Sequence, residues 1–134
     1  METNATTIAP VSKKLVWTGR IISGLISAFM LFGAVFTLVN PDAVKKDFAA
    51  FGYPEGYLQG LIITEIGCVV LYLIPQTAVL GAILMTGYLG GAVATHVRMA
   101  DPGAAFPVVF GILVWLALLF REPRLRPLIP LRKC

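Results

Sequence analysis

Glu65 is the residue whose type and position most strongly suggest chemistry, because its carboxyl group stands within a long apolar stretch. If that stretch crosses a membrane, an ionised carboxylate near its centre costs at least ~2.5 kcal/mol. Such a side chain is expected to face neighbouring helices. There it either binds a proton or a ligand, or it is a hydrogen-bonding link between helices. The sequence leaves both roles open.

A second group of polar side chains follows one line of a later helix. Tyr88, Ala92 and His96 are spaced four residues apart, which places them on one helix face, and Arg98 comes shortly after them. We therefore expect a polar cleft that is open to the outer side of the membrane and is lined by Glu65, Tyr88, His96 and Arg98.

The sequence lacks the residue patterns of several other kinds of site. One histidine and scattered acids do not make a metal-ligand set. No glycine-rich phosphate loop follows a strand, and no nucleophile is paired with a base. We therefore expect no metal and no cofactor other than a quinone. The missing catalytic constellation favours a protein that is not an enzyme on its own.

The composition indicates lipid as the main solvent of this chain. Of its 134 residues, 57% are hydrophobic and only 13% are charged, whereas soluble domains carry about 25% charged residues. The net charge of +4 could suggest a nucleic-acid partner. The cations lie at the flanks of apolar runs, however, which is typical of membrane anchoring and excludes a nucleic-acid site.

The elements that must position these residues are membrane-spanning helices. Each crossing needs about 20 helical residues, and the long uncharged run over 66–95 is interrupted at Pro75, where a helix should end. The sequence predicts an all-α fold, a polytopic bundle of four transmembrane helices in a single membrane domain over 1–134. The expected spans are about 16–39, 56–74, 77–97 and 104–120.

The distribution of Lys and Arg predicts the orientation of the bundle. Positive charges gather on the cytoplasmic side of short loops, and most of the 11 cations lie before the first span or after the fourth. We therefore expect an inner-membrane protein with both termini in the cytoplasm. An aromatic belt at the two membrane interfaces is expected from Trp17, Tyr53, Tyr57 and Tyr72.

Two segments outside the spans have patterns of their own. Over 41–51, Val44, Phe48 and Phe51 recur at helical spacing with charges around the other side, which predicts a short amphipathic helix lying in the outer interface. The tail over 121–134 mixes prolines with cations, which predicts an extended segment against anionic lipid.

Small residues mark the faces that should pack between helices. Gly87 and Gly91 form a Gly-x-x-x-Gly pattern, and Gly19, Ser23 and Ser27 recur every four residues on the first helix. Small side chains let helix backbones approach closely, so we expect both lines to be packing faces. At ~1.5 Å per residue, Tyr88 and Ser27 come to a similar depth as Glu65, which makes them its expected hydrogen-bond partners.

One stretch resembles the signature of the DoxX-like family of small bacterial membrane proteins. It comprises Gly87-Tyr-Leu-Gly-Gly-Ala92 and Thr95-His-Val-Arg98, supported by Glu65 in the second helix, Phe106-Pro107 at the fourth and Arg-Glu-Pro-Arg after it. The resemblance covers about 15–120 and implies a four-helix membrane fold. Relatives in the wider group are linked to quinol oxidation, to thiol-redox complexes or to receptor assembly. It carries over Glu65, Tyr88, His96 and Arg98 as pocket residues.

Three functions are compatible with these patterns. The first is a redox-associated subunit whose cleft binds a quinone-like molecule or a lipid head group. The second is a non-enzymatic protein that assembles or stabilises another membrane protein, such as a redox complex. The third is proton-coupled export of small molecules, although small exporters carry their membrane carboxylate on the first helix. The paired-cysteine motif of dithiol chemistry is missing, since Cys68 and Cys134 are far apart.

Overall fold

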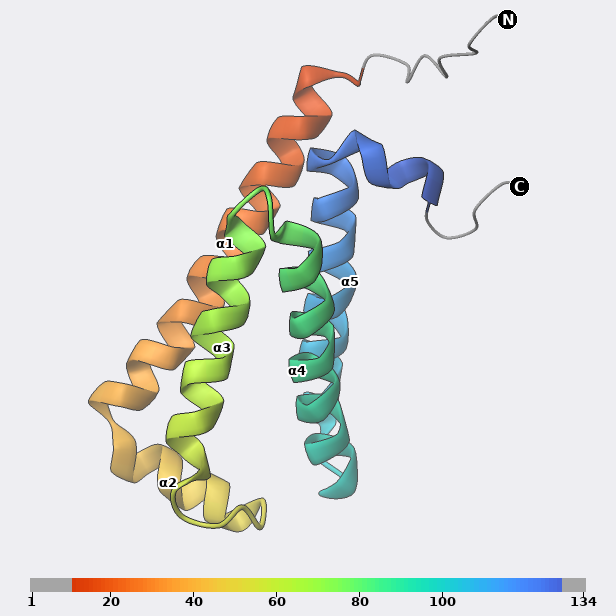
Figure 1. Cartoon of the computed structure of the whole chain (residues 1–134). Helices are drawn as coiled ribbons and strands as arrows, with labels where there is room; N and C mark the ends of the chain where they lie inside the picture. Colours follow the sequence, from red (N-terminus) through yellow and green to blue (C-terminus); the bar gives the residue numbers. More distant parts are fainter. Residues whose placement is uncertain (1–10, 129–134) are drawn as a thin grey trace, which may run out of the picture.

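A computed structural model describes residues 11–128, and over that range the chain contains helices and no strand (Figure 1). The expected fold class, an all-α bundle of membrane helices, is confirmed. The helices begin and end within about three residues of the expected spans. In chain order they are α1 (Lys13–Val39), α2 (Pro41–Ala50), α3 (Tyr57–Leu73), α4 (Ala78–Arg98), the short 3-10 helix η1 (Pro102–Ala104), α5 (Ala105–Arg121) and the 3-10 helix η2 (Pro123–Leu128).

Three segments of the described chain are long and apolar enough to cross a membrane: α1, α4 and the continuous segment Pro102–Arg121 that contains α5. The fourth expected span, α3, is a shorter apolar helix of 17 residues. At ~1.5 Å per residue it is about 25 Å long, at the lower end of the range for transmembrane helices. Together the four helices form the expected bundle.

Each long helix packs against two others, so that the four form a closed ring. α1 packs on α3 and α5, and α4 packs on the same two helices from the opposite side. The beginning of α1, the turn between α3 and α4, and the end of α5 lie at one end of the bundle. α2 and the connection from α4 to α5 lie at the other end (Figure 1). We call these the turn end and the α2 end.

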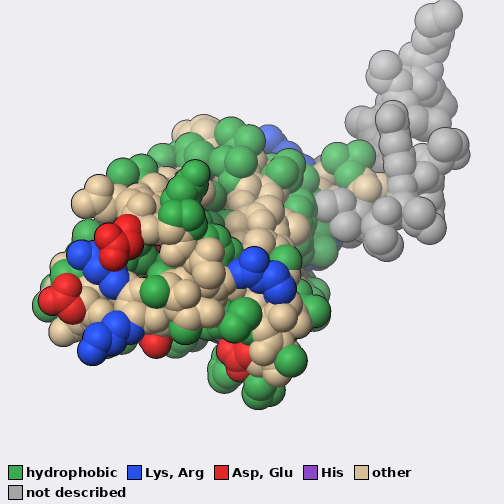
Figure 2. Space-filling view, turned by 90° about the horizontal axis from the view of Figure 1, so that it is seen from below, with side chains coloured by type: hydrophobic (Ala, Val, Ile, Leu, Met, Phe, Trp, Pro, Cys, Tyr) green, Lys and Arg blue, Asp and Glu red, His purple; other side chains and the backbone are tan. Residues whose placement is uncertain are grey.

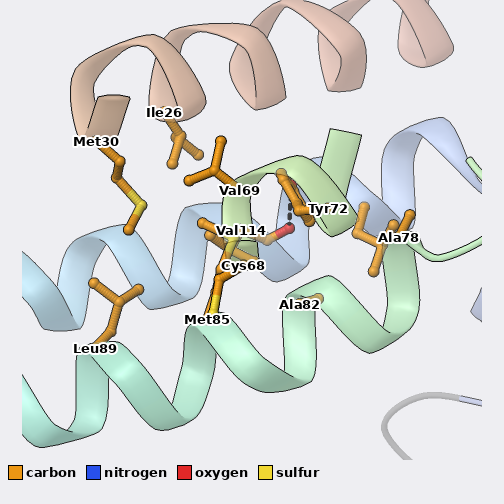
Figure 3. Close-up of a cluster of buried hydrophobic side chains, with 11 residues drawn as sticks. Ile26, Met30, Cys68, Val69, Tyr72, Ala78, Ala82, Met85, Leu89 and Val114 are labelled. Atoms are coloured by element: carbon orange, nitrogen blue, oxygen red, sulfur yellow. Dashed lines mark hydrogen bonds between the residues drawn. The ribbon is translucent and has the colours of Figure 1, made fainter. Parts of the chain in front are cut away.

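The core of the bundle is apolar apart from Tyr72 and two buried serines, Ser23 and Ser27. Tyr72 is fully buried among side chains of all four long helices, including Met85 and Val114 (Figure 3). Its hydroxyl donates to the Val114 carbonyl oxygen at 2.8 Å and lies 3.1 Å from Ser23 Oγ. The expectation that Tyr72 belongs to an interfacial aromatic belt is therefore wrong. The prediction used only the position of Tyr72 near a helix end, and that position does not tell whether the side chain points inward or outward.

Close contacts between helix backbones occur at two glycines. A Cβ atom on Gly19 would come within 2.7 Å of the Ala117 carbonyl oxygen and the Arg121 nitrogen of α5. This is the close approach that small residues on the first helix predicted, and Ser23 and Ser27 on the same line are buried. The second is Gly81, where a Cβ atom would meet the backbone of Tyr72 at 2.2 Å.

Among the described residues, no neighbouring helix packs on Gly87 or Gly91, so their Gly-x-x-x-Gly pattern is not a packing face within this chain. A Cβ atom on either glycine would find no heavy atom within 4 Å, and both residues are exposed. The pattern marks a face without side chains. A second helix was expected to fill that face, and here open space lies over it instead.

The two segments outside the spans differ in outcome. The helix over 41–51 is present as α2, with Val44 and Phe48 half-buried and the charged residues exposed. The tail was expected to be extended, but its first part forms the 3-10 helix η2. Arg126 stabilises that helix by donating to the carbonyl oxygen of Leu119 near the end of α5. Residues 129–134, with Cys134, lie outside the described range.

Candidate functional site

A groove between α3 and α4 is the main candidate site. α3 and α4 lie close together at their connecting turn and diverge toward the α2 end (Figure 1). The space between them has a volume of about 390 Å³. Its walls are mainly aromatic and aliphatic, with Phe48 and Phe51 near the α2 end, Leu61 from α3, and Tyr88 from α4.

The floor of the groove is the glycine face of α4. Gly87, Gly91 and Ala92 line it, so that the helix backbone itself is accessible to a ligand. Glycine lets a ligand approach a backbone closely because it has no Cβ atom. The same residues that were expected to admit a neighbouring helix therefore leave room for a smaller molecule.

Tyr88 and Glu65 form the polar pair that their depths predicted. The Tyr88 hydroxyl donates to Glu65 Oε2 at 3.1 Å, and both side chains are half-buried. The alternative partner for Glu65, Ser27, is not used: its buried hydroxyl has no hydrogen-bond partner among the described residues. The pair links α3 to α4 in the middle of the bundle.

Glu65 does not line the groove itself. It lines a second, smaller cavity of about 180 Å³, together with Phe29 and Met30 of α1 and Phe106 and Phe110 of α5. Tyr88 lines both cavities. Tyr88 is thus shared by the walls of the groove and of the second cavity, and its hydroxyl group donates the hydrogen bond to the carboxyl group of Glu65.

The segment 51–53, which we call the strap, is tied across the α2 end to the last turn of α4. Arg98 donates to the Phe51 carbonyl oxygen, and the hydroxyl groups of Tyr53 and Thr95 lie 2.6 Å apart. The Phe51 ring meets His96 edge-on, with 5.6 Å between ring centroids. These contacts bring the strap over the groove, and they place Arg98 on its outer surface and not in its lining.

His96 is held in place by an acid that sequence reasoning missed. His96 Nδ1 lies 2.7 Å from Asp101 Oδ2, and the other carboxylate oxygen accepts from the Gly103 nitrogen at 2.9 Å. The bond from Gly103, and then that from His96, lower the pKa of Asp101 below its usual value. Asp101 is therefore a carboxylate at neutral pH. The signal was available, since Asp before Pro-Gly is typical of a side chain that caps a turn.

The four expected cleft residues come together only in part. Tyr88 and His96 line the groove, Glu65 lies behind Tyr88, and Arg98 fastens the strap. Outside the groove, the α2 end carries charges of both signs (Figure 2). The groove residues that sequence reasoning did not propose as a site come from the strap and its surroundings: Phe48, Phe51, Tyr53, Leu61, Thr64, Ala92 and Thr95.

Metal ligands and thiols add nothing to this site. Within residues 11–128, no three His, Cys, Asp or Glu side chains gather in a way that could hold a metal ion. Cys68 is buried in the apolar core beside Met85 and Val69, away from the groove lining.

Comparison with known proteins agrees with the motif on α4. No curated protein and no solved structure matches this chain significantly. The profile of the DoxX-like family matches residues 21–117, which include the four membrane helices from early in α1 to late in α5. Since this match covers well over half of the sequence, the chain belongs to the DoxX-like family, a membrane protein by the apolarity of its helices.

Proposed function

We propose that this protein binds the head group of a membrane-borne amphiphile, a quinone-like molecule or a lipid, in the groove between α3 and α4. On its own it is a binding subunit and not an enzyme. The observation that carries the proposal is Tyr88, which lines a mainly apolar and aromatic groove and donates a hydrogen bond to Glu65 behind it.

The composition of the groove suits an amphiphile with a small polar head. Small-molecule pockets have volumes of ~300–1,000 Å³ and combine apolar walls with a few fixed polar groups. Here the polar residues that line the groove are Tyr53, Thr64, Tyr88, Thr95 and His96. Because the Tyr88 hydroxyl group donates a hydrogen bond to Glu65, the lone pairs of its oxygen are free to accept another hydrogen bond. The Phe51 ring offers an apolar face for a head-group ring.

The orientation that fits this proposal places the turn end in the cytoplasm of an inner-membrane protein and the groove on the outer side. In the described residues the turn end carries several cations and one acid, Glu122. The α2 end carries three cations and four acids: Lys45, Lys46 and Arg98, with Asp42, Asp47, Glu55 and Asp101. This is the asymmetry that cytoplasmic retention of Lys and Arg produces.

Reporter domains inserted after residues 53, 76 and 101 are expected to locate outside, inside and outside, respectively. Each site lies in a connection between long helices, so that insertion leaves the spans whole. Alkaline phosphatase activity and green fluorescence, compared at each site, measure the side. A cytoplasmic signal at residue 53 would reverse the orientation and place the groove on the inner side.

Filling the groove is expected to abolish most of the binding. Gly91→Leu puts an isobutyl group onto the groove floor, where no other atom blocks it. The affinity should fall about 10- to 100-fold, as expected for a clash worth ~1–3 kcal/mol. Dissociation constants are measured by native mass spectrometry, with a short-chain benzoquinone in one titration and phosphatidylethanolamine in the other.

Gly90→Leu is the matched control for this experiment. Gly90 is also exposed on α4 with open space around it, but it does not line the groove. Its substitution should leave both affinities unchanged. The compound whose affinity Gly91→Leu lowers identifies the class of ligand, a quinone or a lipid. If both variants bind like the unchanged protein, or if neither compound binds to it, the groove is not the site.

A further inference from the structure

A third pocket lies at the turn end of the bundle, at the opposite end of α4 from His96 and the groove. It has a volume of about 390 Å³ and is formed where α1, the α3–α4 turn and the end of α5 meet. Arg20 of α1 and Arg121 of α5 both line it. The rest of its wall is mainly apolar and also includes polar residues: Ser23, Gly24, Leu73, Pro75, Ala78, Leu118 and Glu122.

The two arginines are brought together by the closest contact between α1 and α5. At Gly19 the backbone of α1 comes so near to α5 that a Cβ atom would lie 2.7 Å from the backbone nitrogen of Arg121. Arg20 is the next residue along α1. Two cations from helices that are distant in the sequence therefore line one pocket. The packing of the two helix backbones fixes the positions from which both side chains extend.

Both guanidinium groups are supported by aromatic rings. The Arg121 guanidinium lies 4.4 Å from the centre of the buried Tyr72 ring and donates to the Tyr72 carbonyl oxygen. The Arg20 guanidinium lies 5.5 Å from the centre of the exposed Trp17 ring. Arg121 uses one N–H group on the Tyr72 carbonyl oxygen, and since a guanidinium carries five N–H donors, others are left for an oxyanion.

The positive charge of this pocket is only partly offset within the described part of the chain, because two arginines and one acid line it. Glu122 also lines the pocket, yet among residues 11–128 neither Arg20 nor Arg121 forms an ion pair with it or with any other carboxylate. The planar guanidinium group of arginine can donate two parallel hydrogen bonds to two oxygens of a phosphate group. An anion with apolar substituents would satisfy both the cations and the leucine wall.

We propose that the pocket between Arg20 and Arg121 binds a phosphate group, and that its source is the head group of an anionic phospholipid. The exposed Leu73 side chain in the wall of the pocket then receives the first part of the acyl chains. Trp17 lies on the exposed face of α1 beside Arg20, and tryptophan is typical of the depth at which lipid head groups lie. This site is independent of the groove and of whatever the groove binds.

Lipid titrations of the full chain in mild detergent test this proposal. The unchanged protein should bind phosphatidylglycerol about tenfold more tightly than phosphatidylcholine in native mass spectrometry. Arg20→Gln should remove that preference by lowering the affinity for phosphatidylglycerol about tenfold. This is the usual effect of losing one charged hydrogen bond. Arg20 is exposed and makes no hydrogen bond in the described structure, so this variant should fold normally.

Arg124→Gln is the matched control, because it removes one exposed cation of the same end that does not line the pocket. It should leave the preference intact. Equal losses in both variants would show a diffuse charge effect and overturn the proposal, as would the lack of any preference in the unchanged protein. Inorganic phosphate is added as a competitor. If it displaces phosphatidylglycerol at equal concentration, the phosphate site stands but its source is soluble phosphate.

Discussion

Gly81→Ala is expected to prevent the α3–α4 hairpin from closing and to leave little folded protein. The added Cβ atom would lie 2.2 Å from the Tyr72 nitrogen and 2.4 Å from its Cα atom. Both are backbone atoms, which cannot move aside as the end of a flexible side chain can. Overpacking of this kind costs about 1–3 kcal/mol where side chains can adjust, and more where they cannot. We therefore expect a loss above ~3 kcal/mol.

The measurement is the unfolding free energy in mixed micelles, with the yield of monodisperse protein as a second measure. Gly87→Ala is the matched control, because it makes the same substitution on the same helix at a position with nothing within 4 Å. It should be neutral or stabilise the helix by up to ~1 kcal/mol, since alanine is the better helix former. Similar unfolding free energies for the two variants would contradict the close contact at Gly81.

Tyr72→Phe is expected to destabilise the bundle by about 1–2 kcal/mol. The hydroxyl of Tyr72 connects three helices: it belongs to α3, donates to the Val114 carbonyl oxygen of α5 and lies 3.1 Å from Ser23 Oγ of α1. Phenylalanine keeps the ring and its contact with Arg121, so that only the hydrogen bonds are lost. Ser23 would then be a buried hydroxyl without its partner on α3.

A double-mutant cycle separates this effect from changes in packing. If the two hydroxyls interact, Ser23→Ala should cost less in the Tyr72→Phe background than in the unchanged protein. Tyr57→Phe is the control on the same helix, because Tyr57 is 64% exposed and its loss should leave the unfolding free energy unchanged. Full additivity of Tyr72→Phe and Ser23→Ala would argue against the bond between them.

The sequence predicted the membrane helices well because a bilayer requires long uncharged segments, which can be recognised directly in the sequence. Long uncharged runs locate the spans, and Pro75 divides the longest of them where the turn between α3 and α4 is found. The helix α2 followed from a proline at its start and from the spacing of Val44 and Phe48. Each of these features depends on neighbours within a few residues. They need no knowledge of how the helices pack.

The candidate site could be predicted only in part. The contact between Tyr88 and Glu65 followed from depth, because a buried carboxyl group needs a partner and few polar side chains lie at its level. Depth says nothing about the direction in which a side chain points around its helix. The strap was missed for a related reason: Phe51 and Tyr53 reach Arg98 and Thr95 only after the chain has crossed the membrane twice more.

What the tertiary structure alone decided is which face of each helix meets protein and which meets open space. Gly81 packs against backbone while Gly87 and Gly91 do not, and Tyr72 is buried while Tyr57 is exposed. In a soluble protein the change from apolar to polar residues would mark these faces. In a membrane helix both faces are apolar, because lipid and protein core are similar solvents. The rotation of each helix is then set by close packing, which only the assembled bundle defines.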